Sequence, residues 1–222
     1  AVKERVVEAR IGISYISEEM ALAALERECG EASFEELRAR AEESWEEKLS
    51  RVEIEAVSET QMKTFYSCLY RTFLFPRKAY ELDQNGEPVH YVPYDDSVKP
   101  GVRYTDNCFW DTYRTLFPLF TLTAREEFGE MLEGFVTDYK DGGWLPRWTA
   151  GDAQNCMPST AIDAVIADVA TRNLISKDLQ FYSNNLWLLF HLMDFCILGV
   201  EFYNAKEMLR HFCLQAKQYL RL

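Results

Sequence analysis

The sequence lacks the closely spaced cysteines and histidines that build zinc sites and disulfide scaffolds. Its six cysteines are spread along 222 residues without a Cys-x-x-Cys pair, so neither a zinc site nor a disulfide framework is indicated. Free thiols are the simplest interpretation, and one isolated disulfide stays open. The three histidines (His90, His191 and His211) have no metal-ligand spacing, so each is expected to be structural or solvent-facing.

An excess of positive charge and a long apolar run are also missing. The net charge of -12 and the pI near 4.8 exclude nucleic acid and an anionic membrane as expected partners and favour a neutral or cationic ligand. Residues Ala1 to Arg10 have no apolar core of a signal peptide and no initiator Met, so the chain is expected to be a processed product or an excised piece. The run Leu186 to Val200 is too short to span a membrane and carries two polar residues, which predicts a buried helix. The compartment is left open.

Capping signals predict a mainly helical first third. Ser17 is expected to cap a helix ending at Gly30, Ser33-Phe-Glu-Glu36 is a capping box, and Ser58-Glu-Thr-Gln61 opens a third helix. Before them, Val6 to Ile16 alternates loosely between apolar and polar residues and predicts one strand without a partner.

The later segments predict one hairpin among further helices. Asn85-Gly86 is a strong hairpin signal, and Asp95 to Gly101 reads as a polar loop. A helix is expected from Phe109 to Phe117, with Asp106 or Asn107 as its cap and Pro118 as its stop, and another from a Thr123 to Glu126 capping box to Gly142-Gly143. A third is expected to bury Ile162, Val165, Ile166 and Val169. Two more helices are expected over about 178–198 and 202–220.

The segment Tyr104 to Arg114 is the most informative one. It combines aromatic rings, carboxylates, an amide and a guanidinium, which is poor core material. A flat ring such as that of Trp110 can stack on the apolar face of a pyranose, and carboxylates such as that of Asp111 accept hydrogen bonds from vicinal hydroxyls. The composition of this segment favours a sugar-binding surface.

Five blocks in fixed order resemble family 92 of the glycoside hydrolases, the calcium-dependent inverting exo-acting α-mannosidases. They are Phe65-Tyr-Ser-Cys-Leu-Tyr70, Thr72-Phe-Leu-Phe-Pro-Arg77, the Tyr104 to Arg114 segment, Gly142-Gly-Trp-Leu-Pro-Arg-Trp148 and Cys156 to Asp168. The sequence departs from the family at Cys108 and Ser159, where the family usually has Gly, and no family pattern is found beyond about Asn173. That loss suggests a truncated or frame-shifted reading of a longer gene.

The resemblance implies that the chain contains parts of two domains, the linker between them and a tail. Residues 1–16 would be the end of an N-terminal β-sandwich, 17–57 linker helices, 58–172 the first part of an (α/α)6 catalytic barrel, and 173–222 a helical tail of uncertain origin. The fold class is therefore mainly α, a partial (α/α)6 barrel preceded by a terminal strand and linker helices, with a small β-hairpin insertion.

The family's catalytic motifs are missing from this sequence. The resemblance places the general acid in a Gly-Asn-Glu-Pro motif and the base in a Gly-Asn-Asp-type motif, and neither occurs here; Asn85-Gly-Glu-Pro88 has similar letters in another order. No catalytic residue and no metal ligand is therefore expected in this chain. The resemblance implies that the complete enzyme uses calcium, and that this chain alone does not bind it.

Three residues are predicted to hold a mannose-containing glycan: Trp110, Asp111 and Arg147. The resemblance implies that Asp111 binds sugar hydroxyls; without it, a helix-start carboxylate on the helix dipole is an equal alternative. For Trp110 the alternative is core packing, and for Arg147 it is a surface guanidinium stacked on Trp148.

Other carboxylates are given structural roles. Asp106 and Asn107 are taken as helix caps, Asp152 and Asp163 as caps or exposed charges, and Asp168 as a satisfied structural carboxylate.

The implied function is removal of terminal α-linked mannose, which requires two carboxyl groups about 6.5 to 9.5 Å apart in an inverting enzyme. The alternative is a non-catalytic helical carbohydrate-binding or interaction module, which would bind sugar without turnover. A different (α/α)6 glycosidase or a phosphorylase is a third interpretation.

Overall fold

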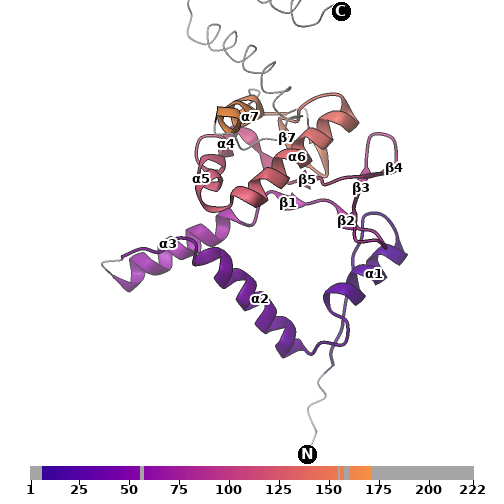
Figure 1. The fold of residues 1–222 in the computed structure, drawn as a ribbon, viewed down its shortest axis with the longest axis horizontal. Helices are drawn as coiled ribbons and strands as arrows, with labels where there is room; N and C mark the ends of the chain where they lie inside the picture. Colours follow the sequence, from indigo (N-terminus) through magenta and orange to yellow (C-terminus); the bar gives the residue numbers. More distant parts are fainter. Residues whose placement is uncertain (1–6, 56–57, 155, 158–160, 172–222) are drawn as a thin grey trace, which may run out of the picture.

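A computed structural model describes residues 7–55, 58–154, 156–157 and 161–171 of the chain. It is mainly helical with three small antiparallel sheets, which confirms the expected fold class at that level (Figure 1). The (α/α)6 barrel stays a prediction. The two helices expected over 178–198 and 202–220 lie outside the described residues. Within the described part, no helix is both long and apolar enough to cross a membrane.

The first three helices begin where the capping signals place them. They are α1 (Glu18–Glu28), α2 (Phe34–Leu49) and α3 (Glu59–Thr72). The side chains of Ser17, Ser33 and Ser58 each accept a hydrogen bond from a backbone N–H of the first turn, and the Ser33 capping box is complete. Each cap satisfies a donor that a helix start leaves without an intrahelical partner.

These helices lie at the edge of the molecule. Neither α1 nor α2 has a buried residue, and α3 buries only Leu69. Figure 1 shows them running outside the cluster formed by the later helices. The rings of Trp45 and Tyr70, 4.4 Å apart, join α2 to α3.

The strand predicted over Val6 to Ile16 is wrong for the described residues. Residues 7–14 form no regular structure, and Val7, Ile11 and Ile13 are at least 80% exposed. A strand needs a neighbour for its backbone groups, and no described segment pairs with this one. Glu81 nevertheless holds the segment, because its carboxylate accepts hydrogen bonds from the Ser14 hydroxyl (2.6 Å) and the Tyr15 N–H (2.7 Å).

Short strands connect the helices. β1 (Arg77–Lys78) pairs with β5 (Tyr104–Thr105); β2 (Glu81–Leu82), β3 (Pro88–Val92) and β4 (Ser97–Pro100) form a second sheet; β6 (Asn107–Cys108), β7 (Trp148–Ala150) and β8 (Asp152–Gln154) form a third.

The predicted hairpin at Asn85-Gly86 is confirmed by the pairing of β2 with β3. The polar loop predicted over Asp95 to Gly101 is wrong, because β4 pairs with β3 there and aligns Lys99 with His90. A turn with Asp96 at φ 56° reverses the chain, so four residues read as loop become strand.

The later helices are α4 (Phe109–Thr112), α5 (Leu116–Thr123), α6 (Arg125–Gly142) and α7 (Ala161–Thr171). The single helix predicted from Phe109 to Phe117 is therefore split. Pro118 does not stop a helix; it lies in the first turn of α5, where no intrahelical N–H is required.

The ends of α6 differ in how well they were predicted. Thr123 does not cap α6, because it is the last residue of α5 and its hydroxyl donates to the Leu119 carbonyl (3.1 Å). The residue before α6 is Ala124, and no side chain caps the helix. The predicted end is confirmed, since Gly143 adopts the left-handed conformation after the helix.

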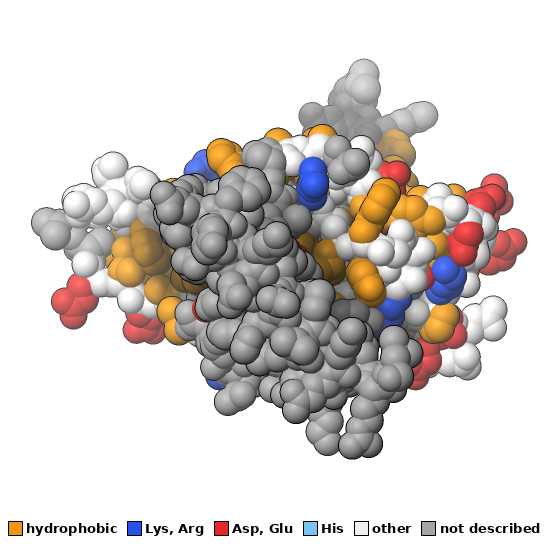
Figure 2. All heavy atoms as spheres, turned by 90° about the horizontal axis from the view of Figure 1, so that it is seen from above, with side chains coloured by type: hydrophobic (Ala, Val, Ile, Leu, Met, Phe, Trp, Pro, Cys, Tyr) orange, Lys and Arg blue, Asp and Glu red, His pale blue; other side chains and the backbone are white. Residues whose placement is uncertain are grey.

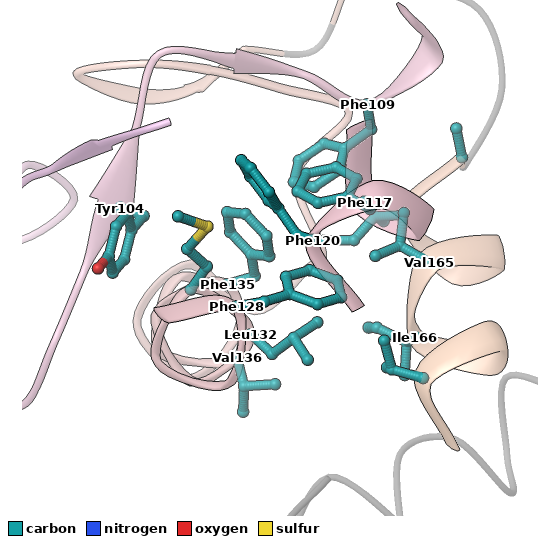
Figure 3. Packing of buried hydrophobic residues seen from close by; sticks show 14 of the residues in the cluster. Tyr104, Phe109, Phe117, Phe120, Phe128, Leu132, Phe135, Val136, Val165 and Ile166 are labelled. Atoms are coloured by element: carbon teal, nitrogen blue, oxygen red, sulfur yellow. The ribbon is translucent and has the colours of Figure 1, made fainter. Parts of the chain in front are cut away.

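The core lies between α5, α6 and α7. Figure 3 shows the phenylalanine rings of α4 and α5 against those of α6, with Val165 and Ile166 of α7 closing the other side. The Phe109 and Phe135 rings meet edge to face at 4.9 Å, and Phe117 stacks on Phe128 at 5.3 Å. Each buried side chain of this kind contributes about 1.5–3 kcal/mol, so this cluster is the main anchor of the fold. The buried stripe predicted for α7 (Ile162, Val165, Ile166 and Val169) is confirmed.

Apolar side chains also reach the surface. On the face shown in Figure 2, orange apolar side chains lie between acidic side chains at the left and right ends. The large apolar residues of the described part that are more than half exposed outside the N-terminal segment are Leu22, Phe34, Leu122 and Trp144.

Candidate functional site

Pairing of β6 with β7 brings the two candidate segments together. In this register Cys108 is opposite Trp148 and Asn107 is opposite Thr149. Trp110 and Asp111 follow Cys108 in the chain, and Arg147 directly precedes Trp148. The sheet therefore places the three predicted sugar-binding residues at neighbouring ends of two paired strands.

Asp106 and Asn107 are not the helix caps that were predicted. The residue before α4 is Cys108, and no side chain caps this helix. Asp106 has a positive φ of 60° and instead forms an ion pair with Arg77.

Asn107 is 3% exposed and connects two elements of the site. Its N–H donates to the Thr149 hydroxyl of β7 at 3.2 Å, and its amide oxygen accepts from Thr112 of α4 at 3.4 Å. Its side-chain nitrogen is buried without a hydrogen-bond partner among the described residues.

Trp110 and Asp111 point to the surface of α4. Trp110 is 50% exposed, which argues against the core alternative, and Asp111 is exposed as well. Burial of Cys108, and a hydrogen bond from its thiol to Asp111, raise the pKa of that thiol. The Asp111 carboxylate is thus accessible at the start of a helix, with one neighbour that donates a weak hydrogen bond.

Arg147 lies at the edge of a hollow of about 400 Å³. The hollow is also lined by Trp144, Gln154 and Asp163, but not by Trp110 or Asp111. Within the described residues, Arg147 forms no ion pair and no cation–π contact with Trp148. Its guanidinium is therefore accessible to a ligand, and the predicted stacking alternative is not found.

A buried ion pair fixes the β7–β8 hairpin. The guanidinium of Arg103 donates to Asp138 at 2.8 Å and to the Gly151 carbonyl at 2.7 Å, and the Gly151 N–H donates to the Thr105 hydroxyl at 2.8 Å. Arg103 is 4% exposed and Asp138 0%. Burial raises the pKa of Asp138, although Arg103 acts in the opposite direction. The tip of the hairpin that follows Arg147 is consequently held at two groups, the carbonyl and the N–H of Gly151.

Sequence reasoning missed Arg103 and Asp138. Asp138 lies within a helix otherwise rich in exposed charge, and neither residue belongs to a motif, so no sequence signal distinguishes them. Among the carboxylates given structural roles, Asp163 is 7% exposed and lines the hollow beside Arg147, and Asp152 accepts a hydrogen bond from Gln154.

The site offers an indole, a carboxylate and a guanidinium for binding hydroxyl groups. The described residues contain no group of three or more His, Cys, Asp or Glu side chains that could hold a metal ion. The described residues therefore do not fit a calcium site.

Comparison with known proteins gives consistent matches. The model of the glycosyl hydrolase family 92 catalytic domain matches residues 20–187. This match includes the expected linker helices and continues past Asn173, so the expectation that the family pattern ends there is wrong. A relative from Arthroderma benhamiae, described as an uncharacterized secreted glycosidase, is 34% identical over 114 residues, which are 49% of this chain and 13% of the relative.

Two solved structures from Bacteroides thetaiotaomicron share the fold. An inverting mannosidase of family 92 is 40% identical with a TM-score of 0.70, covering 72% of this chain and 22% of its own. A second family 92 α-mannosidase, also solved with mannoimidazole, is 25% identical with a TM-score of 0.68, covering 79% of this chain and 24% of its own. The chain thus spans less than a quarter of the length of these mannosidases.

Proposed function

Because the chain belongs to family 92 of the glycosyl hydrolases, we propose that it is part of an enzyme that removes terminal α-linked mannose from glycans with inversion and the help of calcium. The 40% identity to an inverting mannosidase is the observation that carries this proposal. Within that enzyme, this chain supplies groups that hold the sugar, while the acid, the base and the calcium ligands belong to other segments.

The proposed roles follow from accessible chemistry. Asp111 accepts hydrogen bonds from vicinal hydroxyls of the terminal mannose, and Arg147 donates to hydroxyl oxygens. The exposed face of Trp110 covers the apolar side of the ring. Binding that orients the sugar in this way lowers the barrier of a reaction whose catalytic groups must act from opposite faces of the ring.

Binding is tested by titrating methyl α-mannopyranoside against the tryptophan fluorescence of the chain. Asp111→Asn and Arg147→Gln are each expected to weaken binding by about 10- to 100-fold, since each loses a charged hydrogen bond of roughly 1.5–3 kcal/mol. Glu42→Gln on the exposed surface of α2 is the matched control and is expected to change nothing. Equal affinity of the wild type and both site variants would contradict the proposed roles.

Turnover distinguishes the proposal from a carbohydrate-binding module. The isolated chain is expected to bind the sugar without hydrolysing 4-nitrophenyl α-mannopyranoside, with or without added calcium, because it lacks the Gly-Asn-Glu-Pro motif. A longer protein that contains this chain and that motif is expected to hydrolyse it. Mannose release by the chain alone would refute the assigned division of roles, and its absence from the longer protein would favour the binding module.

A further inference from the structure

A second hollow borders the β7–β8 hairpin, away from the proposed site residues. Its volume is about 310 Å³, which lies at the lower end for small-molecule sites. Residues from five separate stretches of the chain line it, among them Tyr15, Arg77, Tyr91, Asp106 and Asp152. None of Trp110, Asp111 and Arg147 contributes to this lining.

The charges that line this hollow balance. Two guanidinium groups (Arg77 and Arg103) stand against two carboxylates (Asp106 and Asp152), so the formal charges cancel. Arg77 is ion-paired with Asp106, and Arg103 is engaged by a further buried carboxylate, that of Asp138. A strongly ionic ligand would have to break these pairs, whereas a neutral ligand with many hydroxyl groups can bind to the outer edges of both charges.

Hydrogen bonds hold some of the groups that line the hollow. The Tyr15 backbone is held by Glu81 at 2.7 Å, although its ring is 67% exposed. The Tyr91 hydroxyl donates to Asp96 at 2.8 Å. Asp106 adopts the left-handed backbone region. A residue other than glycine is strained there, and such strain is often found where a site requires one particular side-chain orientation. Groups that are already held in place lose less entropy on binding.

We infer that this hollow is a second carbohydrate-binding site and that it takes one neutral hexopyranose. Arg77 and Asp106 contact ring hydroxyls, and the exposed ring of Tyr15 lies against an apolar sugar face. This second site is inferred from the residues that line the hollow. Only the choice of a mannose derivative as the probe rests on the proposed function.

The test is a titration of the ¹⁵N-labelled chain with methyl α-mannopyranoside, followed by amide chemical shifts. Saturable shifts are expected at Tyr15, Arg77 and Thr105. Amides of Trp110 and Asp111 report on the proposed site separately in the same spectra.

Variants link the shifts to the hollow. Arg77→Gln is expected to weaken binding about 10-fold at the Tyr15 and Thr105 amides and to leave binding at Trp110 unchanged. Arg77 is 57% exposed, so the fold is expected to tolerate this change, and Arg38→Gln, an ion-paired arginine that is 62% exposed on α2, is the matched control.

The outcomes separate the two proposals. Shifts confined to Trp110 and Asp111 overturn the second site and leave the proposed function in place. Shifts confined to Tyr15, Arg77 and Thr105 that Arg77→Gln weakens support the second site and contradict the assigned mannose-binding residues. Shifts at neither set, or an equal effect of Arg38→Gln and Arg77→Gln, overturn the second site.

Discussion

Arg103 and Asp138 are buried residues that position the exposed residues of the site. The pair is almost completely buried, and Arg103 also holds the Gly151 carbonyl at the tip of the β7–β8 hairpin. The exposed residue Arg147 precedes that hairpin, so its position depends on two side chains outside the proposed mannose site.

Loss of this pair is expected to be costly. Arg103→Met leaves the buried Asp138 carboxylate without its partner and should lower the free energy of unfolding by about 3 kcal/mol. Arg38→Met, which breaks an ion pair between side chains that are 62% and 66% exposed, should cost less than about 0.5 kcal/mol. Urea denaturation measures both, and an equal small loss in the two variants would argue against a structural role for the buried pair.

Among single residues, the candidates for sugar binding have a signal in the sequence, whereas the residues that position them do not. Trp110, Asp111 and Arg147 lie in motif-like segments with unusual composition, and the structure leaves all three accessible. Asp106 and Asn107 were read as caps because their residue types favour that position. Tertiary contacts decided otherwise, through Arg77 for Asp106 and Thr149 for Asn107.

Among the elements, α6 packs closely on β5 at Gly134. A Cβ added at Gly134 would lie 2.8 Å from a ring carbon of Tyr104 in β5 and 3.1 Å from its backbone nitrogen, whereas a Cβ at Gly129 of the same helix would meet nothing within 4 Å. Gly134 therefore allows the helix to pack directly on the strand that leads to the site.

This pair of glycines gives a matched test. Gly134→Ala is expected to destabilise the chain by about 1–3 kcal/mol through overpacking. Gly129→Ala should stabilise it by about 0.5–1 kcal/mol, since alanine has the higher helix propensity. Thermal denaturation followed by circular dichroism compares them. A Gly134→Ala variant as stable as Gly129→Ala would refute the close packing of α6 on β5.

Glu127 joins α6 to α2 across a partly exposed interface. Burial disfavours its charge, but hydrogen bonds from Lys48 (2.9 Å) and from Arg51 outweigh burial and lower the pKa of Glu127 to about 2. A carboxyl group with a lowered folded-state pKa stabilises the fold above its unfolded pKa, and that contribution is lost as the pH falls through the folded value.

The Glu127→Gln variant should therefore be less stable than the wild type by about 1–2 kcal/mol at pH 7, after allowance for solvent screening. The difference is expected to shrink as the pH falls from 4.5, the ordinary pKa of a glutamate side chain, to about pH 2. Urea denaturation at several pH values follows it. A difference that stays constant down to pH 2 would show that ionisation of Glu127 is not its source.

The start of a helix could be predicted where a side chain of the preceding residue caps it, and could not be predicted where no side-chain cap is present. Ser17, Ser33 and Ser58 act within their own first turn, so the sequence contains the whole signal. The starts of α4 and α6 have no side-chain cap, because the preceding residues belong to a strand or to another helix. The short strands β6 and β7 depend on partners about 40 residues away in the chain, and local patterns do not record them.

For the whole molecule, stability is expected to be uneven. The helices α1 and α2 have no buried residues, whereas α6 has seven. Since the chain spans 22% of a mannosidase that it matches, we expect the other segments of a longer family 92 protein to cover part of this exposed surface.

Hydrogen exchange of the isolated chain measures this difference. Amides of α1 and α2 are expected to exchange at least about 100-fold faster than those of α6, because opening them exposes little apolar surface. Equal protection of α2 and α6 would contradict this account. In a longer family 92 protein that contains the chain, the protection of α1 and α2 is expected to rise.

The central claim is that Trp110, Asp111 and Arg147 hold a mannose unit, and a crystal structure of the chain with methyl α-mannopyranoside tests it most directly. The account predicts a sugar whose hydroxyls lie within about 3.2 Å of the Asp111 carboxylate and the Arg147 guanidinium, with the Trp110 ring beside it. A sugar bound only elsewhere, with all three side chains open to solvent, would contradict it.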